Sequence, residues 1–178
     1  MPEERIVESK EIYQGRVFDL RVETIALDGG QTYKREMVIH NGAVAMVPLD
    51  PDGNVFFVRQ YRAGADKSLL EIPAGMLNDG EEREAAARRE LQEEIGYYPE
   101  KLTRLGLFYV AASYTTEAIT IYLAEDLRPS KLPGDVDEHI TVEKLPLKEA
   151  LKNVLSNEIE DAKTLIGLVW AAQHLKVD

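Results

Sequence analysis

The sequence predicts an α+β fold in which sheets are packed between helices. Three observations support this class. Short β-like runs fill the first two-thirds of the 178-residue chain, one amphipathic helix interrupts them, and two further helical stretches follow. Strands with helices set between and after them are typical of an α+β sandwich. Hydrophobic residues make up 44% of the chain, which is enough to bury a core in a domain of this length.

The predicted strands are runs rich in β-branched and aromatic residues, and turn dipeptides separate them. Gly29-Gly30, Asn41-Gly42 and Asp52-Gly53 each fall between two such runs. Because a Gly-Gly pair suits a tight turn, the first of them predicts a hairpin. The runs in this part of the chain cover residues 16–27, 31–40, 43–49, 54–61 and 69–72.

A helix is predicted over residues 82–95. Ala87, Leu91 and Ile95 recur every four residues and form its buried stripe, and Gly96 is a natural C-terminal stop. Further along, the pattern predicts strands at 103–111, 118–124 and 141–145, a loop at 129–138, and helices at 147–155 and 159–175.

No linker rich in Pro, Gly or Ser divides the chain. Residues 1–42 are predicted to form a small antiparallel sheet of their own, ahead of a main domain over residues 43–178. Apolar residues alternate along the N-terminal segment, at Ile6, Ile12, Val17, Leu20 and Val22. They can cover their own core or a partner subunit, and the sequence leaves both open.

The formal net charge of −11 disfavours nucleic acids and anionic membranes as partners, because both are polyanions. No apolar run approaches the ~18 residues that span a bilayer, and the acidic N-terminus lacks a secretory pattern. The chain has no cysteine, which excludes disulfides and thiolate metal sites. Cytoplasmic residence is the default expectation, and the absence of cysteine is compatible with any compartment. A small phosphorylated substrate is compatible with the negative net charge, since metal ions held by carboxylates supply local positive charge.

Residues 75–97 concentrate the acidic side chains, in the stretch GMLNDGEEREAAARRELQEEIGY. On a helix Glu90, Glu93 and Glu94 fall at i, i+3 and i+4, so their carboxylates share one side. Like charges held together cost stability unless a cation neutralises them, and Arg89 alone leaves an excess of negative charge. Mg2+ prefers carboxylate and carbonyl oxygens, so this cluster indicates a metal site.

A solvated, charged helix face is the alternative explanation, and three glutamates alone would favour it. The full spacing argues against it. A random sequence of average amino-acid usage would carry these seven residue types at these positions with odds on the order of one in 10^8. Gly75 also permits a close approach of the backbone to the place where the carboxylates gather.

This stretch resembles the Nudix box, G-x5-E-x7-R-E-U-x-E-E-x-G-U, in which U is a bulky aliphatic residue. Only Tyr97 departs, with an aromatic residue in the last aliphatic position. The resemblance implies an α/β/α sandwich with a mixed sheet, the box as loop–helix–loop, and Mg2+-dependent hydrolysis of a nucleoside diphosphate linked to another moiety. The matching residues are Gly75, Glu81, Arg89, Glu90, Leu91, Glu93, Glu94 and Gly96.

The resemblance also implies roles for these residues. Arg89 would orient the glutamates as part of the catalytic set, Glu81 would support the loop, and Glu93 would bind metal directly or through water. Two or more Mg2+ ions, with Mn2+ as a substitute, would bridge the pyrophosphate and lower the pKa of an attacking water. The implied metal ligands are Ala74 through its carbonyl, Glu90, Glu93 and Glu94.

Outside the box, the whole chain resembles ADP-ribose pyrophosphatases and related nucleoside-diphosphate-sugar hydrolases. The stretches YQGRVFDLRVE, YKREMVIHNGAVAMVPL, FFVRQYRAGADKSLLEIPAG and DAKTLIGLVWAAQHL carry this resemblance. It implies a nucleotide substrate and a homodimer formed through the N-terminal sheet. For each arginine a solvated strand position is the alternative, and for Glu71 it is pairing with a nearby arginine. The implied substrate-binding residues are Arg35, Glu36, Arg59, Arg62, Glu71 and Glu117.

One departure from this branch lies after the box. Ala112 stands where these enzymes usually carry the proline of Ser-Pro-Gly, which frees the loop backbone, while Glu117 keeps the acidic position. Tyr114 falls near a tyrosine of diadenosine polyphosphate hydrolases. The catalytic base of the branch comes from a late loop, where alignment favours Glu138; the alternatives are His139 or an ordinary acidic surface loop.

The leading hypothesis is therefore hydrolysis of ADP-ribose or a similar nucleoside diphosphate sugar. Tyr114 keeps cleavage of dinucleoside polyphosphates as a second reading. A catalytically silent domain that binds a nucleotide as a sensor is the third. The complete set of metal-binding carboxylates argues against the third, because a sensor has no need of it.

Overall fold

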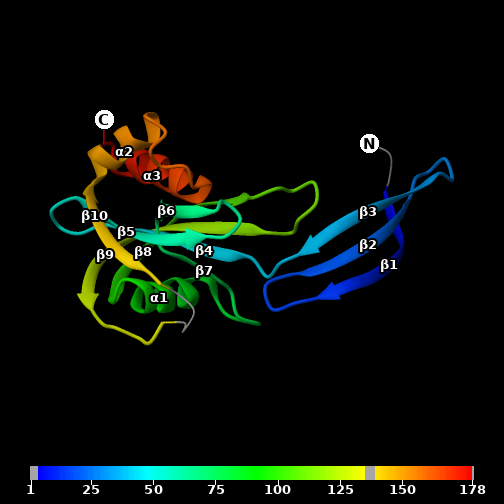
Figure 1. Ribbon diagram of the computed structural model, residues 1–178, viewed down its shortest axis with the longest axis horizontal. Helices are drawn as coiled ribbons and strands as arrows, with labels where there is room; N and C mark the ends of the chain where they lie inside the picture. The colour runs from blue at the N-terminus through cyan, green and yellow to red at the C-terminus, as the bar shows by residue number, and fades with distance from the viewer. Residues whose placement is uncertain (1–3, 135–138, 178) are drawn as a thin grey trace. The chain divides into compact units, whose positions relative to one another are not determined.

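The computed structural model describes residues 4–134 and 139–177 (Figure 1). By backbone proximity the chain divides into two compact units, one of Met1–Gly42 with Phe108–Ala118 and one of Ala43–Leu107 with Ile119–Asp178. The first unit thus takes in a segment that lies inside the main domain of the sequence prediction. The elements are β1 (Arg5–Gln14), β2 (Asp19–Ala26), β3 (Thr32–Ile39), β4 (Ala43–Pro48), β5 (Asn54–Arg62), β6 (Lys67–Glu71), β7 (Ala74–Met76), α1 (Arg83–Glu94), β8 (Tyr97–Tyr109), β9 (Ala118–Pro129), β10 (Thr141–Pro146), α2 (Leu147–Leu155) and α3 (Ala162–Leu175).

The smaller unit is built on a three-stranded antiparallel sheet in the order β1-β2-β3. Strand β1 is exposed along its whole length and precedes the first predicted strand, which begins at residue 16. The segment between β8 and β9 joins this unit through the end of β3. The Val38 amide donates to the Tyr114 carbonyl at 2.8 Å, and the Thr116 amide donates back to the Val38 carbonyl at 3.0 Å.

The larger unit contains two sheets, one ordered β10-β5-β6 and the other β7-β4-β9-β8. Strands β4 and β9 pair in parallel, whereas β4 and β7 pair antiparallel, so the second sheet is mixed. Helix α1 lies on one side of these sheets, and α2 and α3 lie on the other (Figure 1). Gly167 of α3 permits close packing on β4, because a Cβ there would lie 3.2 Å from Val47 and 2.8 Å from Ile72.

The structure confirms the predicted α+β class and most of its elements. Helix α2 has the predicted bounds, and α1 differs from its prediction by one residue at each end. Gly96 takes a φ of 78° just after α1, as a helix stop requires. Strand β8 begins six residues before the predicted 103, and the sequence misses β7 because three residues are too short to show periodicity.

Within residues 4–134 and 139–177, no helix has the length and apolar character needed to cross a membrane.

Candidate active site

Helix α1 carries the acidic residues of the box and is anchored by its apolar stripe. Ala87 and Leu91 are fully buried against β4 and β5. On the adjoining side Glu90 is only 9% exposed and Glu94 only 6%. A solvated helix face would leave both carboxylates in water, so that explanation is wrong for these two. Burying a charged carboxylate is costly without compensating partners, and the neighbouring residues supply them.

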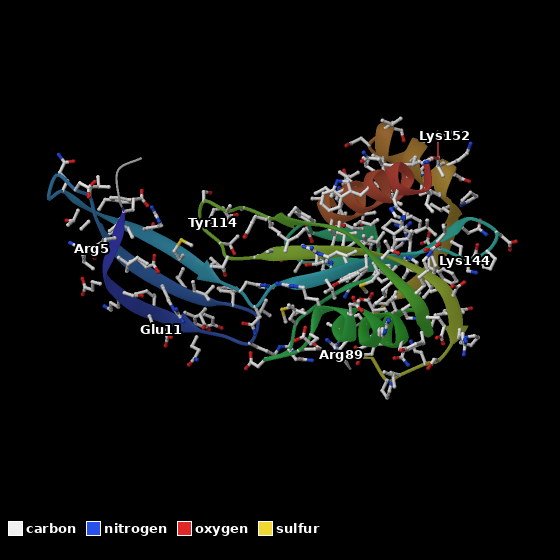
Figure 2. The ribbon with its side chains drawn as sticks, turned by 180° about the vertical axis from the view of Figure 1, so that it is seen from behind. Arg5, Glu11, Arg89, Tyr114, Lys144 and Lys152 are labelled. Atoms are coloured by element: carbon white, nitrogen blue, oxygen red, sulfur yellow. The ribbon has the colours of Figure 1, made fainter. Side chains whose placement is uncertain are left out.

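Arg89 connects the acidic residues to one another, and Figure 2 labels it beside α1. Its Nη1 donates to Glu90 at 2.6 Å and to Glu93, one turn on, at 2.9 Å. Its Nε and Nη2 donate to both carboxylate oxygens of Glu81 at 2.8 and 2.9 Å. The Glu81 carboxylate also accepts from the Asn78 amide at 3.0 Å, which closes the loop before the helix.

These contacts shift the acid–base equilibria of both partners. The hydrogen bond from Arg89 holds the pKa of Glu81 below its ordinary value, although burial acts in the opposite direction. The same hydrogen bond, together with the charge of Glu90 and the hydrogen bonds to Glu90 and Glu93, raises the pKa of Arg89. The arginine therefore stays charged and pairs with three glutamates at once.

Strand β7 brings backbone atoms to the buried carboxylates. The Ala74 amide donates to Glu94 Oε2 at 3.1 Å. Gly75 lies directly under Glu90, since a Cβ at this position would stand 2.0 Å from the Glu90 carboxylate carbon. Pairing with β4, at Val44↔Gly75 and Ala45↔Ala74, keeps this short strand in place. Only glycine fits there without displacing the carboxylate.

The set of oxygen donors at this place is of the chemical type that suits a hard divalent cation. It consists of the carboxylates of Glu90, Glu93 and Glu94 and the nearby backbone of β7, and oxygen ligands of this kind suit Mg2+. In the part of the chain that the structure describes, no three acidic or histidine side chains converge on one point as a ligand set. Arg89 instead pairs directly with Glu90 and Glu93.

A second charged group lies at the end of β6, just before the box. Glu71 is 1% exposed, and its two oxygens accept from Nε and Nη2 of Arg62, each at 2.7 Å. Lys163 donates to the same carboxylate at 2.5 Å. Burial pushes the pKa of Glu71 up, but the hydrogen bond from Arg62 and the charge of Lys163 outweigh it and hold that pKa below its ordinary value. Glu71 is thus an ionised partner of Arg62, which is the alternative considered for it from sequence.

Arg59 lies on the other face of β5 from Arg62, because successive strand residues alternate and the two are three positions apart. Arg62 shares its face with Phe56 and Val58, which pack in the α1 core. Arg59 pairs instead with Glu143 of β10, with Nε 2.5 Å from the carboxylate. The structure therefore groups Arg62 with the box and separates Arg59 from it.

The remaining candidate substrate residues belong to the smaller unit. Arg35 and Glu36 lie on β3, and Arg35 donates to Glu4 at 2.7 Å and to the Tyr33 hydroxyl at 2.5 Å. Glu117 ends the segment that docks on β3, and its carbonyl accepts from the Val110 amide at 3.1 Å. These three residues share one compact unit, while Arg59, Arg62, Glu71 and the box share the other.

Ala112, in place of the usual proline, lies in a closed turn. The amides of Tyr114 and Thr115 both donate to the Ala111 carbonyl at 3.1 Å, so the turn is held without a proline. Tyr114 is 55% exposed, and Figure 2 shows it at the tip between β8 and β9.

The candidate base Glu138 lies outside the described residues. The chain that leads toward it is fixed on α1: the Ser130 amide donates to the Gly96 carbonyl at 2.8 Å, and the Leu132 amide donates to the Gln92 carbonyl at 3.1 Å. His139, the alternative base, is exposed.

Sequence reasoning missed Lys163 and its neighbours at the start of α3. Asp161 caps this helix by accepting from the Thr164 amide at 3.0 Å. The signal was present, since an aspartate three residues before a threonine at a helix start is a capping pattern. The sequence cannot show that the lysine between them points to Glu71, because 92 residues separate the two.

Comparison with known proteins finds relatives over nearly the whole chain. Residues 39–166 match the family model described as NUDIX domain. The chain is 40% identical over 177 residues to an ADP-ribose pyrophosphatase from Bacillus subtilis (strain 168), with 98% of this chain and 94% of the relative covered. It is 38% identical over 170 residues to a methanol dehydrogenase activator from Bacillus methanolicus, with 94% and 92% covered. A crystal structure of an ADP compounds hydrolase has a TM-score of 0.87 at 27% identity, with 98% and 95% covered.

The match with the family model contains the whole box, together with the strands and helices that position it. The relatives match over nearly the full length of the chain. The chain therefore belongs to the NUDIX family.

Proposed function

We propose that this NUDIX pyrophosphatase hydrolyses the pyrophosphate bond of ADP-ribose or a related nucleoside diphosphate sugar. The products are a nucleoside monophosphate and a sugar phosphate, and Mg2+ is the cofactor, with Mn2+ as a substitute. The names of the relatives support this reaction class, since they include ADP-ribose pyrophosphatase, GDP-mannose pyrophosphatase and ADP compounds hydrolase.

One observation carries the proposal. Glu90 and Glu94 are buried against the backbone of Ala74 and Gly75, with Arg89 paired to the acidic cluster. A purely structural helix gains nothing from two buried carboxylates, because apolar residues would pack there at lower cost. A site that binds a divalent cation needs them.

The residues have distinct tasks in the proposed reaction. The carboxylates of Glu90, Glu93 and Glu94 and the Ala74 carbonyl hold the metal. When bound, the metal supplies positive charge for the pyrophosphate and lowers the pKa of the attacking water. Arg89 keeps the glutamates oriented.

Arg62 is the first of the substrate-binding residues that we propose. Glu71 fixes Arg62, whose side chain is 41% exposed and therefore available to a phosphate group. The further candidates that we propose from the resemblance are Arg35, Glu36, Arg59 and Glu117.

A substrate panel tests the proposal. Purified protein is incubated with ADP-ribose, GDP-mannose and diadenosine polyphosphates, each with Mg2+, Mn2+ or EDTA, and the products are separated by ion-exchange chromatography. We expect fastest turnover of a nucleoside diphosphate sugar with Mg2+ and none with EDTA. Preference for diadenosine compounds would instead support the second reading, for which exposed Tyr114 is the supporting feature. If no compound is turned over, the remaining hypothesis is the catalytically silent domain that binds a nucleotide as a sensor.

For the general base we propose Glu138. Gly134, four residues earlier, lies beside the end of α1, since a Cβ there would be 3.5 Å from the Glu93 carbonyl.

Glu138→Gln is expected to lower kcat by roughly 10^2 to 10^4-fold, the usual contribution of a general base, with a smaller change in KM. Its pH–rate profile should also lose the limb that reports deprotonation of the base. The measurement is steady-state kinetics across pH. His139→Gln serves as the comparison and should retain most activity. If His139→Gln loses this limb of the pH–rate profile and Glu138→Gln keeps it, His139 is the base.

We also propose a homodimer formed by the sheet of the smaller unit. Its exposed apolar residues include Ile6 (56%), Val7 (50%), Ile12 (50%) and Tyr13 (55%), and a concentration of such residues on one sheet is typical of an interface. Light scattering should give about twice the monomer mass of 20.0 kDa. Ile12→Arg should shift the protein toward monomer, whereas Val169→Arg, at an equally exposed position on α3, should not. A wild-type mass of one chain contradicts the dimer.

A further inference from the structure

The start of α3 carries a polar cluster that the proposed reaction does not use. Asp161 caps the helix, since its Oδ2 accepts from the amide and the hydroxyl of Thr164 at 3.0 and 2.5 Å. Its Oδ1 accepts from Lys163 at 3.0 Å. The cap therefore fixes both side chains in the first turn of the helix.

Both side chains contact the residues that lead into the box. Lys163 donates to Glu71 at 2.5 Å, and the Thr164 hydroxyl accepts from the Ile72 amide at 2.9 Å. The Lys163 side chain is 11% exposed and the Glu71 side chain 1%. Because water is largely excluded, this ion pair is screened far less than a surface pair.

Glu71 transmits the contact to Arg62. Its carboxylate accepts two hydrogen bonds from one edge of the guanidinium, a bidentate geometry that fixes orientation as well as distance. Three residues after Glu71, the Ala74 amide is already bonded to Glu94. The start of α3 is thus connected through Glu71 to the arginine proposed to bind phosphate, and through the backbone after Glu71 to the carboxylates proposed to bind metal.

We propose that Lys163 is a positioning residue for the hydrolysis. It fixes the Glu71 carboxylate, so that Glu71 holds Arg62 in the orientation that grips the substrate's phosphate. The inference rests on the proposed function, in which Arg62 binds phosphate. Lys163 touches neither substrate nor metal in this account and acts through Glu71 alone.

The competing explanation is a structural tie between β6 and α3. A nearby ion pair provides the matched comparison: Lys67 of β6 binds Glu160, the residue before the Asp161 cap, and both side chains are exposed, at 51% and 41%. Exposed pairs of this kind contribute little to stability. Lys67→Met therefore removes a lysine that joins the same two parts of the chain but does not contact Glu71.

Steady-state kinetics on the nucleoside diphosphate sugar that the wild type turns over best will test the inference. Lys163→Met is expected to lower kcat/KM about 10 to 100-fold, since a small displacement of a positioned group costs up to that much. Most of the loss should appear in KM, because Arg62 grips phosphate before and during the reaction. Lys163→Arg should restore most of the activity, and Lys67→Met should match the wild type.

A double-mutant cycle separates positioning from simple destabilisation. If Lys163 acts through Arg62, adding Lys163→Met to Arg62→Ala causes no further loss of kcat/KM. Equal proportional losses in both backgrounds would overturn the inference. Lys163→Gln keeps a hydrogen-bond donor in this buried place and replaces the methionine variant if that one fails to fold. Wild-type activity in Lys163→Met overturns the inference alone, whereas an inactive wild type overturns the proposed function as well.

Discussion

Glu94→Gln should nearly abolish turnover while leaving the fold intact. We expect kcat to fall by roughly 10^3-fold or more, since one group that stabilises charge at the reacting centre contributes 10^2 to 10^3. The glutamine oxygen can still accept from the Ala74 amide, so the packing of α1 on β7 is retained. The measurements are kcat at saturating Mg2+ and thermal unfolding, whose midpoint should stay within about 4 °C of the wild type.

Glu84→Gln is the matched control for this variant. Glu84 lies in the first turn of the same helix and is exposed, so the same change of charge should leave kcat unaltered. Retained activity in Glu94→Gln would mean that the metal is held elsewhere. A large fall in the unfolding midpoint would instead make Glu94 a structural residue.

Gly75→Ala is expected to lower activity strongly but to lower stability only slightly. A Cβ at this position would overlap the Glu90 carboxylate, with both its oxygens within 2.4 Å. The carboxylate is the end of a flexible side chain and can rotate away, so we expect only a small loss of stability. Activity should fall about 100-fold, the size of effect that follows when a catalytic group moves by an ångström.

Kinetics and thermal unfolding of Gly75→Ala and Gly64→Ala give the comparison. Gly64 has open space around it, since a Cβ there would meet no atom within 4 Å. That variant should match the wild type in both measurements. If Gly75→Ala keeps full activity, Glu90 does not need its place over β7, and its assignment as a metal ligand is wrong.

The sequence predicts the box and the class of fold because both depend on residues that lie close together along the chain. Glu90, Glu93 and Glu94 share a helix face by spacing alone, and Ala87 with Leu91 marks the buried side. What spacing cannot show is burial of the carboxylates, which depends on where β7 runs. The pairing of β7 with β4 joins residues about thirty positions apart.

Long-range pairing explains the other differences as well. Arg59 and Arg62 look alike in sequence, yet strand alternation and the partners Glu143 and Glu71 give them different surroundings. Lys163 lies in the helix predicted over residues 159–175, and its contact with Glu71 forms when the cap of α3 meets the end of β6. Such contacts follow from the tertiary arrangement.

The hairpin of β8 and β9 has a consequence for any attempt to exchange specificity between relatives. Its tip, Phe108–Ala118, belongs to the smaller unit although its strands belong largely to the larger one. The backbone therefore passes between the units three times, after Gly42, Leu107 and Ala118. A chimera cut only after Gly42 would pair the tip of one relative with the β3 strand of another. If Arg35 and Glu117 bind the substrate as proposed, an exchange of specificity has to move both segments together.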